Sequence, residues 1–162
     1  MVLFRYLYIL ALVLWLGGTM VAGGVVAPSI FHVLETWNPV EGRVLGGQVF
    51  GEVLQRLYLV AYAMSAVMFV SLSLHRLLGA RPVKYGIRIS ILAVMLALTL
   101  GADYYVGPRI TTLQAQISGP VSALPAGDPV RGEFNRLHGL ANILLSLSAV
   151  GGLALLFWEA RE

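Results

Sequence analysis

Four long apolar stretches, separated by turn-rich segments, dominate the pattern of hydrophobic and polar positions. They run roughly over Leu7–Pro28, Leu57–Leu74, Ile87–Val106 and Leu140–Trp158. Each has close to the ~20 residues that a helix needs to cross a hydrocarbon layer of ~30 Å. The pattern therefore predicts an all-α integral membrane protein, folded as an up-down four-helix bundle.

Composition supports this prediction. The 162 residues are 58% hydrophobic and 12% charged, and a water-soluble chain of this length does not enclose so many apolar side chains. Four spans and their connections use the whole length, so we expect residues 1–162 to form a single transmembrane domain. The chain has no cysteine, which excludes disulfides, thiolate metal sites and cysteine nucleophiles.

Two pairs of residues predict where helices begin. Asn38-Pro39 and Asp128-Pro129 each place a capping side chain before a proline that suits the first helical turn. Both pairs lie well ahead of the apolar stretches that follow them. We therefore expect the second and fourth helices to extend beyond the outer membrane surface.

Two further prolines lie at the outer ends of the first and third stretches. Pro28 removes a backbone donor, so we expect it to end the first span or to kink it. Pro108 frees the carbonyl of Tyr104 and favours a bend there. The first stretch is longer than the core of a cleaved signal peptide, and we expect the chain to retain it as its first helix.

The connection between the second and third spans is short and basic. It contains Arg76, Arg81, Lys84 and Arg88, with Gly79 and Pro82 as turn residues. Because short basic loops stay on the cytoplasmic side, we expect both termini to lie there, in a bacterial-type plasma membrane. The basic residues are scattered over helix ends, which favours membrane lipid headgroups as partners and disfavours nucleic acid.

Polar residues share one face of the fourth helix. They are separated by four, three, four and four positions, and they are Arg131, Asn135, His138, Asn142 and Ser146. Since the opposite face of this helix is apolar, we expect the polar face to point into the bundle.

Several of these groups lie near the outer ends of their helices together with polar residues from the second and third spans. Ionisable groups at membrane depth are expensive and usually face partners or water. We therefore predict an outward-facing polar vestibule as the candidate ligand site. Its residues are Arg56, Asp103, Arg109, His138 and Asn142.

A ligand-free network is the alternative to this vestibule. In that arrangement Asp103 pairs with Arg56 or Arg109, and His138 bonds to Asn142 or to a tyrosine. Glu52 and Arg56, four positions apart, are expected to form a surface pair.

The three histidines bear on a haem or pigment cofactor. His32 falls in the predicted outer loop, His75 at the inner boundary and His138 near the outer one, so no two share a depth. This disfavours a bis-histidine haem, and we predict no cofactor, with His138 as the one residue suited to be an axial ligand. No hydrolase, metalloprotease or phosphate-binding motif occurs, so we expect a protein that is not an enzyme and has no catalytic residues.

Short motifs spread over most of the chain carry a family resemblance. They are Leu14-Trp15-Leu16-Gly17-Gly18, Val26-Ala27-Pro28 with Phe31, Gly42-Arg43 through Phe50, Gly107-Pro108-Arg109-Ile110, and Phe134 through Leu140 with Asn142. In these motifs the chain resembles the transmembrane protein 205-like domain family, small four-helix membrane proteins of largely unknown role. The resemblance implies fold and location, and it suggests that His138, Asn142, Pro108 and Arg109 lie at whatever site exists.

Three classes of function remain open. The inner halves of the helices carry only scattered hydroxyls, such as Ser71 and Ser73, which favours an accessory subunit of a larger membrane complex. Its partners would be other membrane subunits or further copies of the chain. The alternatives are a transporter of a small solute or ion and a haem- or pigment-binding subunit. Small residues recur every four positions in the first and third spans and fit either internal packing or docking of partner helices. They are Thr19, Gly23 and Ala27, and Ala93, Ala97 and Gly101.

Overall fold

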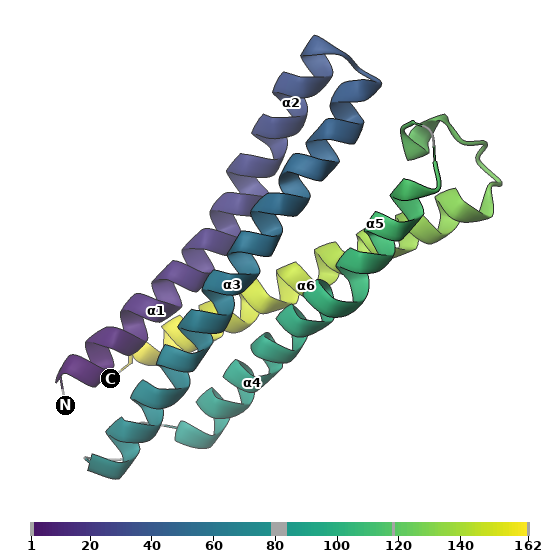
Figure 1. Ribbon diagram of the computed structural model, residues 1–162. Helices are drawn as coiled ribbons and strands as arrows, with labels where there is room; N and C mark the ends of the chain where they lie inside the picture. Colours follow the sequence, from purple (N-terminus) through teal and green to yellow (C-terminus); the bar gives the residue numbers. More distant parts are fainter. Residues whose placement is uncertain (1, 79–83, 118, 162) are drawn as a thin grey trace.

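The computed structural model describes residues 2–78, 84–117 and 119–161, which are built almost entirely from helices (Figure 1). The elements, in chain order, are α1 (Val2–Val21), η1 (Ala22–Val26), α2 (Ala27–Trp37), α3 (Glu41–Leu78), α4 (Tyr85–Gly101), η2 (Ala102–Val106), α5 (Gly107–Ala115), η3 (Val121–Ala123) and α6 (Pro129–Glu159). The segments η1 and η2 are single wide π-helical turns, and η3 is a short 3-10 turn. The predicted turn residues Gly79 and Pro82, with Arg81, lie outside the described residues.

Within the part of the chain that the structure describes, four continuous helices are long and apolar enough to cross a membrane. They are Val2–Trp37, Glu41–Leu78, Tyr85–Ala115 and Pro129–Glu159, with 36, 38, 31 and 31 residues. At 1.5 Å per residue even the shorter ones measure about 46 Å, well above the ~30 Å of a hydrocarbon layer. The predicted four-helix membrane fold is confirmed. The first and third helices are extended as well as the second and fourth.

Pro28 and Pro108, at the outer ends of the first and third apolar stretches, each follow a π-helical turn. Pro28 comes directly after η1, where the amide of Ala27 donates to the carbonyl of Ala22, five residues back. Gly107 repeats this bond to Ala102 ahead of Pro108. A proline ring clashes with the carbonyl four residues earlier, and a widened turn makes room for it. The first helix therefore continues through Pro28.

This continuation corrects the expectation that His32 lies in a loop. His32 is an exposed residue in the middle of α2. The hydroxyl of Thr36 donates to its carbonyl at 2.7 Å, as in an ordinary helical turn.

The predicted helix starts are confirmed by their hydrogen bonds. The side-chain oxygen of Asn38 accepts from the amides of Val40 and Glu41, at 3.0 and 3.2 Å. Asp128 caps α6 by accepting from the amides of Val130 and Arg131, at 2.8 and 3.4 Å. Each cap satisfies backbone donors that a helix start leaves without partners.

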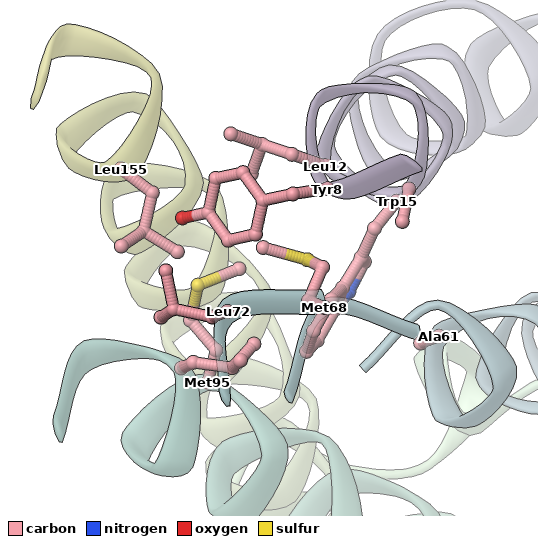
Figure 2. Packing of buried hydrophobic residues seen from close by; sticks show 10 residues of the cluster. Tyr8, Leu12, Trp15, Ala61, Met68, Leu72, Met95 and Leu155 are labelled. Carbon is pink, nitrogen blue, oxygen red and sulfur yellow. The ribbon is translucent and has the colours of Figure 1, made fainter. Parts of the chain in front are cut away.

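All four helices meet around one apolar core at the end of the bundle that holds both chain termini, here called the near end (Figures 1 and 2). Its buried members are Tyr8, Leu12, Ala11 and Trp15 of α1, Ala61, Met68 and Leu72 of α3, Leu92 and Met95 of α4, and Leu155 of α6. Met68 and Met95 are both packed in this core. Two glycines let α6 approach its neighbours, since a Cβ atom at Gly151 would lie 2.7 Å from Met95 and one at Gly152 3.1 Å from Leu16.

At the opposite, far end the helices form two separate hairpins that diverge in Figure 1. In the first hairpin α2 packs so closely on α3 that a Cβ atom at Gly42 would overlap the carbonyl oxygen of Leu34. In the second, Val106 and Leu113 pack on Leu137 of α6. The guanidinium of Arg43 reaches across to the hydroxyl of Ser122 at 3.2 Å.

Candidate functional site

Asp103, at the start of the π-helical turn η2, is the predicted site residue with the most enclosed surroundings. It is half-buried, and the hydroxyl of Tyr62 on α3 donates to its Oδ2 atom at 2.7 Å. Hydrogen bonds to ionised groups are among the stronger ones. This contact ties the third helix to the second.

The two predicted arginines lie on the surface, away from this carboxylate. Arg56 pairs with Glu52 at 3.7 Å, which confirms the expected surface pair. The guanidinium of Arg109 lies 4.1 Å from the centre of the Tyr105 ring. Neither arginine pairs with Asp103 among the described contacts, so the ion pair expected in the ligand-free network is wrong. A tyrosine hydroxyl takes that place.

His138 and Asn142 belong to a polar face of α6 that points away from the bundle. Of the five residues predicted for this face, Arg131 is half-buried and donates to the carbonyl of Leu124 at 2.6 Å. The other four, here called the α6 polar face, are exposed: Asn135, His138, Asn142 and Ser146. The expectation that it points inward is wrong. The buried side of α6 is a different stripe, which carries Leu137, Ser148, Gly152, Leu155 and Glu159.

His138 makes a ring contact in place of the expected hydrogen bond. Its imidazole stacks on Phe134, one turn earlier, with ring centres 6.0 Å apart and planes within 6°. Among the described residues no hydrogen bond or ion pair joins any two of Arg56, Asp103, Arg109, His138 and Asn142. None of the five is among the residues that line the two hollows described below. Whether any of them binds a ligand, including His138 as a haem ligand, stays a prediction.

A small, partly open cavity lies where the four helices meet, beside the apolar core. Its volume of about 20 Å³ is room for one water molecule. Its polar lining comes from the hydroxyl residues Thr19, Tyr58, Thr99 and Ser148. A second hollow is an open apolar groove of about 370 Å³ between α2 and α3, lined by Ser29, Ile30, Val33, Leu34 and Val49.

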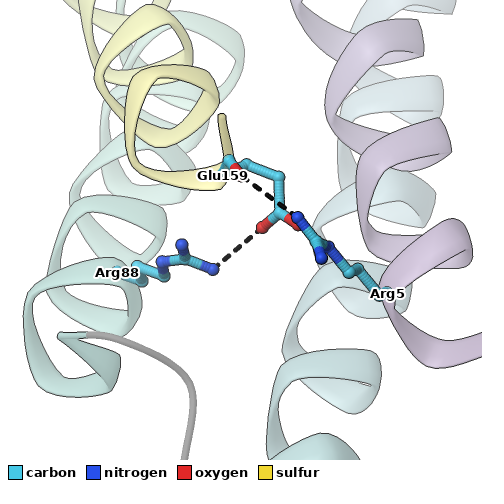
Figure 3. Close-up of polar contacts among 3 residues, drawn as sticks. All are labelled: Arg5, Arg88 and Glu159. Atoms are coloured by element: carbon cyan, nitrogen blue, oxygen red, sulfur yellow. Dashed lines mark hydrogen bonds and ion pairs between the residues drawn. The ribbon is translucent and has the colours of Figure 1, made fainter. Parts of the chain in front are cut away.

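A buried ionic cluster at the near end was missed by the sequence reasoning (Figure 3). Glu159, only 4% exposed, accepts from Arg5 at 2.5 Å and from Arg88 at 2.9 Å. Arg88 is 1% exposed and lies over the ring of Tyr8 at 6.0 Å. The cluster joins α1, α4 and α6. The expectation that Arg5 and Arg88 meet lipid headgroups overlooked the acidic residue at the end of the fourth helix.

No other gathering of ligating side chains stands out. In the described ranges, no three His, Asp or Glu residues come together as a metal site would require. Among the described residues, buried polar groups include the ionic cluster, the hydroxyls around the small cavity, and Ser65 and Ser71 of α3, while Asp103 and Tyr62 form a half-buried contact.

This fold and this distribution of polar groups define a multi-pass membrane protein. Residues 10–118 match the family described as "Domain of unknown function (DUF4149)". The match covers more than half of the chain, which therefore belongs to this family. The comparisons of this chain with curated proteins and with solved structures found no match. The family description gives no biochemical role, and the likeness to the transmembrane protein 205-like domain family stays a prediction.

Proposed function

We propose that this protein is a non-enzymatic accessory subunit of a larger complex in the plasma membrane. The α6 polar face is its docking surface, and the occupant is a transmembrane helix of a different polypeptide. Amide, imidazole and hydroxyl side chains on such a face form hydrogen bonds between helices in a membrane.

The observation that carries the proposal is the exposure of polar groups at membrane depth. Asn142 and Ser146 lie inside the apolar run that ends at Trp158, yet both point outward. Polar groups that face acyl chains lose their hydrogen bonds to water, at a cost that a partner helix removes. The face of α4 supports the same role, because Ala93 and Ala97 are exposed and so do not serve internal packing.

The size of the small cavity also favours docking over transport. Pockets for small molecules measure roughly 300–1,000 Å³, whereas the cavity among the four helices has about 20 Å³. Trp15 and Ala61 of the apolar core line this cavity, and the remaining core residues lie toward the near end, which disfavours a polar path through the bundle.

The orientation of the subunit follows from its charges. The near end carries Arg76, Lys84 and Arg161 among its exposed residues, and we assign it to the cytoplasm by the positive-inside rule. Reporter fusions at the C-terminus and at the far-end segment around Gly127 test this. If a reporter that is active only in the cytoplasm works at Gly127 and not at the C-terminus, the assigned orientation is wrong.

Purification of the complex in mild detergent tests the docking role. The wild-type chain should migrate with a defined partner, and the double variant Asn142→Leu, Ser146→Leu should lose it while keeping its helical circular dichroism. The matched control is Leu147→Ala, an exposed apolar change on another side of α6. A wild-type chain that migrates only as a monomer or homodimer would contradict the proposal.

Ion or proton handling at Asp103 is the second candidate. It is favoured by the half-buried carboxylate and its 2.7 Å hydrogen bond to Tyr62, since ionisable groups within membrane spans often mark ion or proton sites. Flux into liposomes that contain the purified protein tests it. A flux that Asp103→Asn abolishes and Glu52→Gln leaves intact would establish this role in place of docking.

A further inference from the structure

The small cavity lies where all four spanning helices meet, just beyond the apolar core. Trp15 and Thr19 of α1, Tyr58 of α3, Thr99 of α4 and Ser148 of α6 contribute to its lining. Thr19, Thr99 and Ser148 are each about 5% exposed. A hydroxyl group therefore reaches this junction from every spanning helix.

Both threonine hydroxyls already donate their hydrogens to backbone carbonyls. Thr19 donates to the carbonyl of Trp15 at 2.9 Å, and Thr99 donates to that of Met95 at 3.0 Å. A hydroxyl has one hydrogen and two lone pairs. Toward the cavity, these two side chains therefore offer acceptors only.

Ser148 is in the opposite situation. Its hydroxyl forms no hydrogen bond with any residue that the structure describes, although the side chain is 95% buried and lines the cavity. A buried hydroxyl without a partner is costly, and native proteins usually supply that partner from protein or water. Ser148 thus has a hydroxyl that is available to donate into this space.

We infer that the cavity binds one water molecule, which bridges the four helices. The water donates to Thr19 and Thr99 and accepts from Ser148, so each of these hydroxyls gains a partner; Tyr58 is the fourth polar neighbour. The volume suffices for a single water, and buried waters in proteins make about three such bonds. A monovalent cation fits less well, because the lining carries no charged side chain and includes Trp15, Leu57 and Leu98.

Thermal unfolding of the purified protein tests this inference, because a bound water and a dry cavity predict opposite changes in the unfolding midpoint for two substitutions. Ser148→Ala and Thr99→Val each remove one bond to the water, so each should lower the unfolding midpoint by roughly 2–4 °C. In a dry cavity both changes remove a polar group from an apolar space, and the midpoint should stay the same or rise. A midpoint that stays or rises for both variants would overturn the inference.

Two control variants isolate the effect of the cavity. Thr112 donates to the carbonyl of Pro108 at 2.8 Å on an exposed surface, so Thr112→Val loses the same kind of intrahelical bond without touching the cavity. Ser90 is exposed on α4, and Ser90→Ala controls for loss of a serine. The shifts of the cavity variants are measured against these two.

The choice between water and a cation has its own test. Unfolding midpoints in sodium chloride and in choline chloride of equal ionic strength should agree for the wild-type chain. A midpoint that rises in sodium only, and does so no longer in Ser148→Ala, would replace the water with a sodium ion.

Radical footprinting gives a readout that does not depend on stability. Radicals made from bound water by X-ray pulses should oxidise Trp15, which lines the cavity although it is 2% exposed. Met68, fully buried in the apolar core, serves as the dry reference. Labelling of Trp15 that does not fall in Ser148→Ala would contradict a water held by this serine.

Discussion

The two ends of the bundle are built on different principles. At the near end, three helices are tied by the ionic cluster of Arg5, Arg88 and Glu159, and all four pack on one apolar core. At the far end, two hairpins diverge and are joined by the hydrogen bond of Arg43 to Ser122, and many of their polar side chains are exposed. The difference suggests that the near end holds the fold together, while the far half presents a surface to partners.

The largest effect is expected at the ionic cluster. Glu159→Gln leaves the buried guanidinium of Arg88 without its carboxylate, and removal of one partner from a buried ion pair costs about 3–5 kcal/mol. Chemical unfolding in detergent measures the loss. The matched control is Glu52→Gln in the exposed pair with Arg56, for which we expect about 0.5 kcal/mol or less. Equal losses in the two variants would remove the contrast between the ends.

The next largest change in stability is expected at Gly42 of α3, and Gly51 of the same helix serves as its comparison. Gly42→Ala should destabilise the first hairpin by about 1–3 kcal/mol, because the added methyl group overlaps the carbonyl oxygen of Leu34. Gly51→Ala meets nothing within 4 Å and should stabilise α3 by up to about 1 kcal/mol, since alanine favours helix. Hydrogen exchange of the Asn38 region measures both. If Gly42→Ala slows exchange there, the close packing of α2 on α3 is wrong.

A smaller effect is expected where the two hairpins share a polar contact. Tyr62→Phe removes the hydrogen bond to Asp103 and should lower stability by about 1–2 kcal/mol. Tyr6→Phe, at an exposed tyrosine near the N-terminus, is the control and should be neutral. A neutral Tyr62→Phe would mean that this contact contributes nothing to joining the third helix to the second.

The smallest effect on stability is expected at the α6 polar face. Asn142 is exposed and makes no described hydrogen bond, so Asn142→Leu should change the stability of the isolated chain by less than about 0.5 kcal/mol. The unfolding midpoint of the purified variant measures this. A large loss would show that Asn142 supports the bundle itself, against the separation of a stabilising end from a docking surface.

The elements of this fold were readable from the sequence, because each depends on residues close together in the chain. Apolar runs of membrane length predict the spans, and Asn38 and Asp128 announce helix starts by capping their own amides. Pro28 was harder to interpret, since a π-helical turn before it absorbs the clash that would otherwise end the helix.

The site was less predictable, because it depends on contacts between distant residues. Arg5 and Glu159 are 154 positions apart, and nothing in either neighbourhood announces the pair. The inward orientation of the α6 polar face was inferred from an apolar opposite side. In a membrane protein that argument is weak, since apolar residues suit both lipid and core, and the stripe through Ser148 and Leu155 makes the contacts instead.

Site-specific photocrosslinking in native membranes tests the central claim most directly. A photoreactive residue at position 142, on the α6 polar face, should crosslink to one partner protein of defined mass. The same residue at position 147, exposed on another side of α6, should give little product. Crosslinks of equal strength at both positions, or products formed with lipid alone at position 142, would contradict docking through this face.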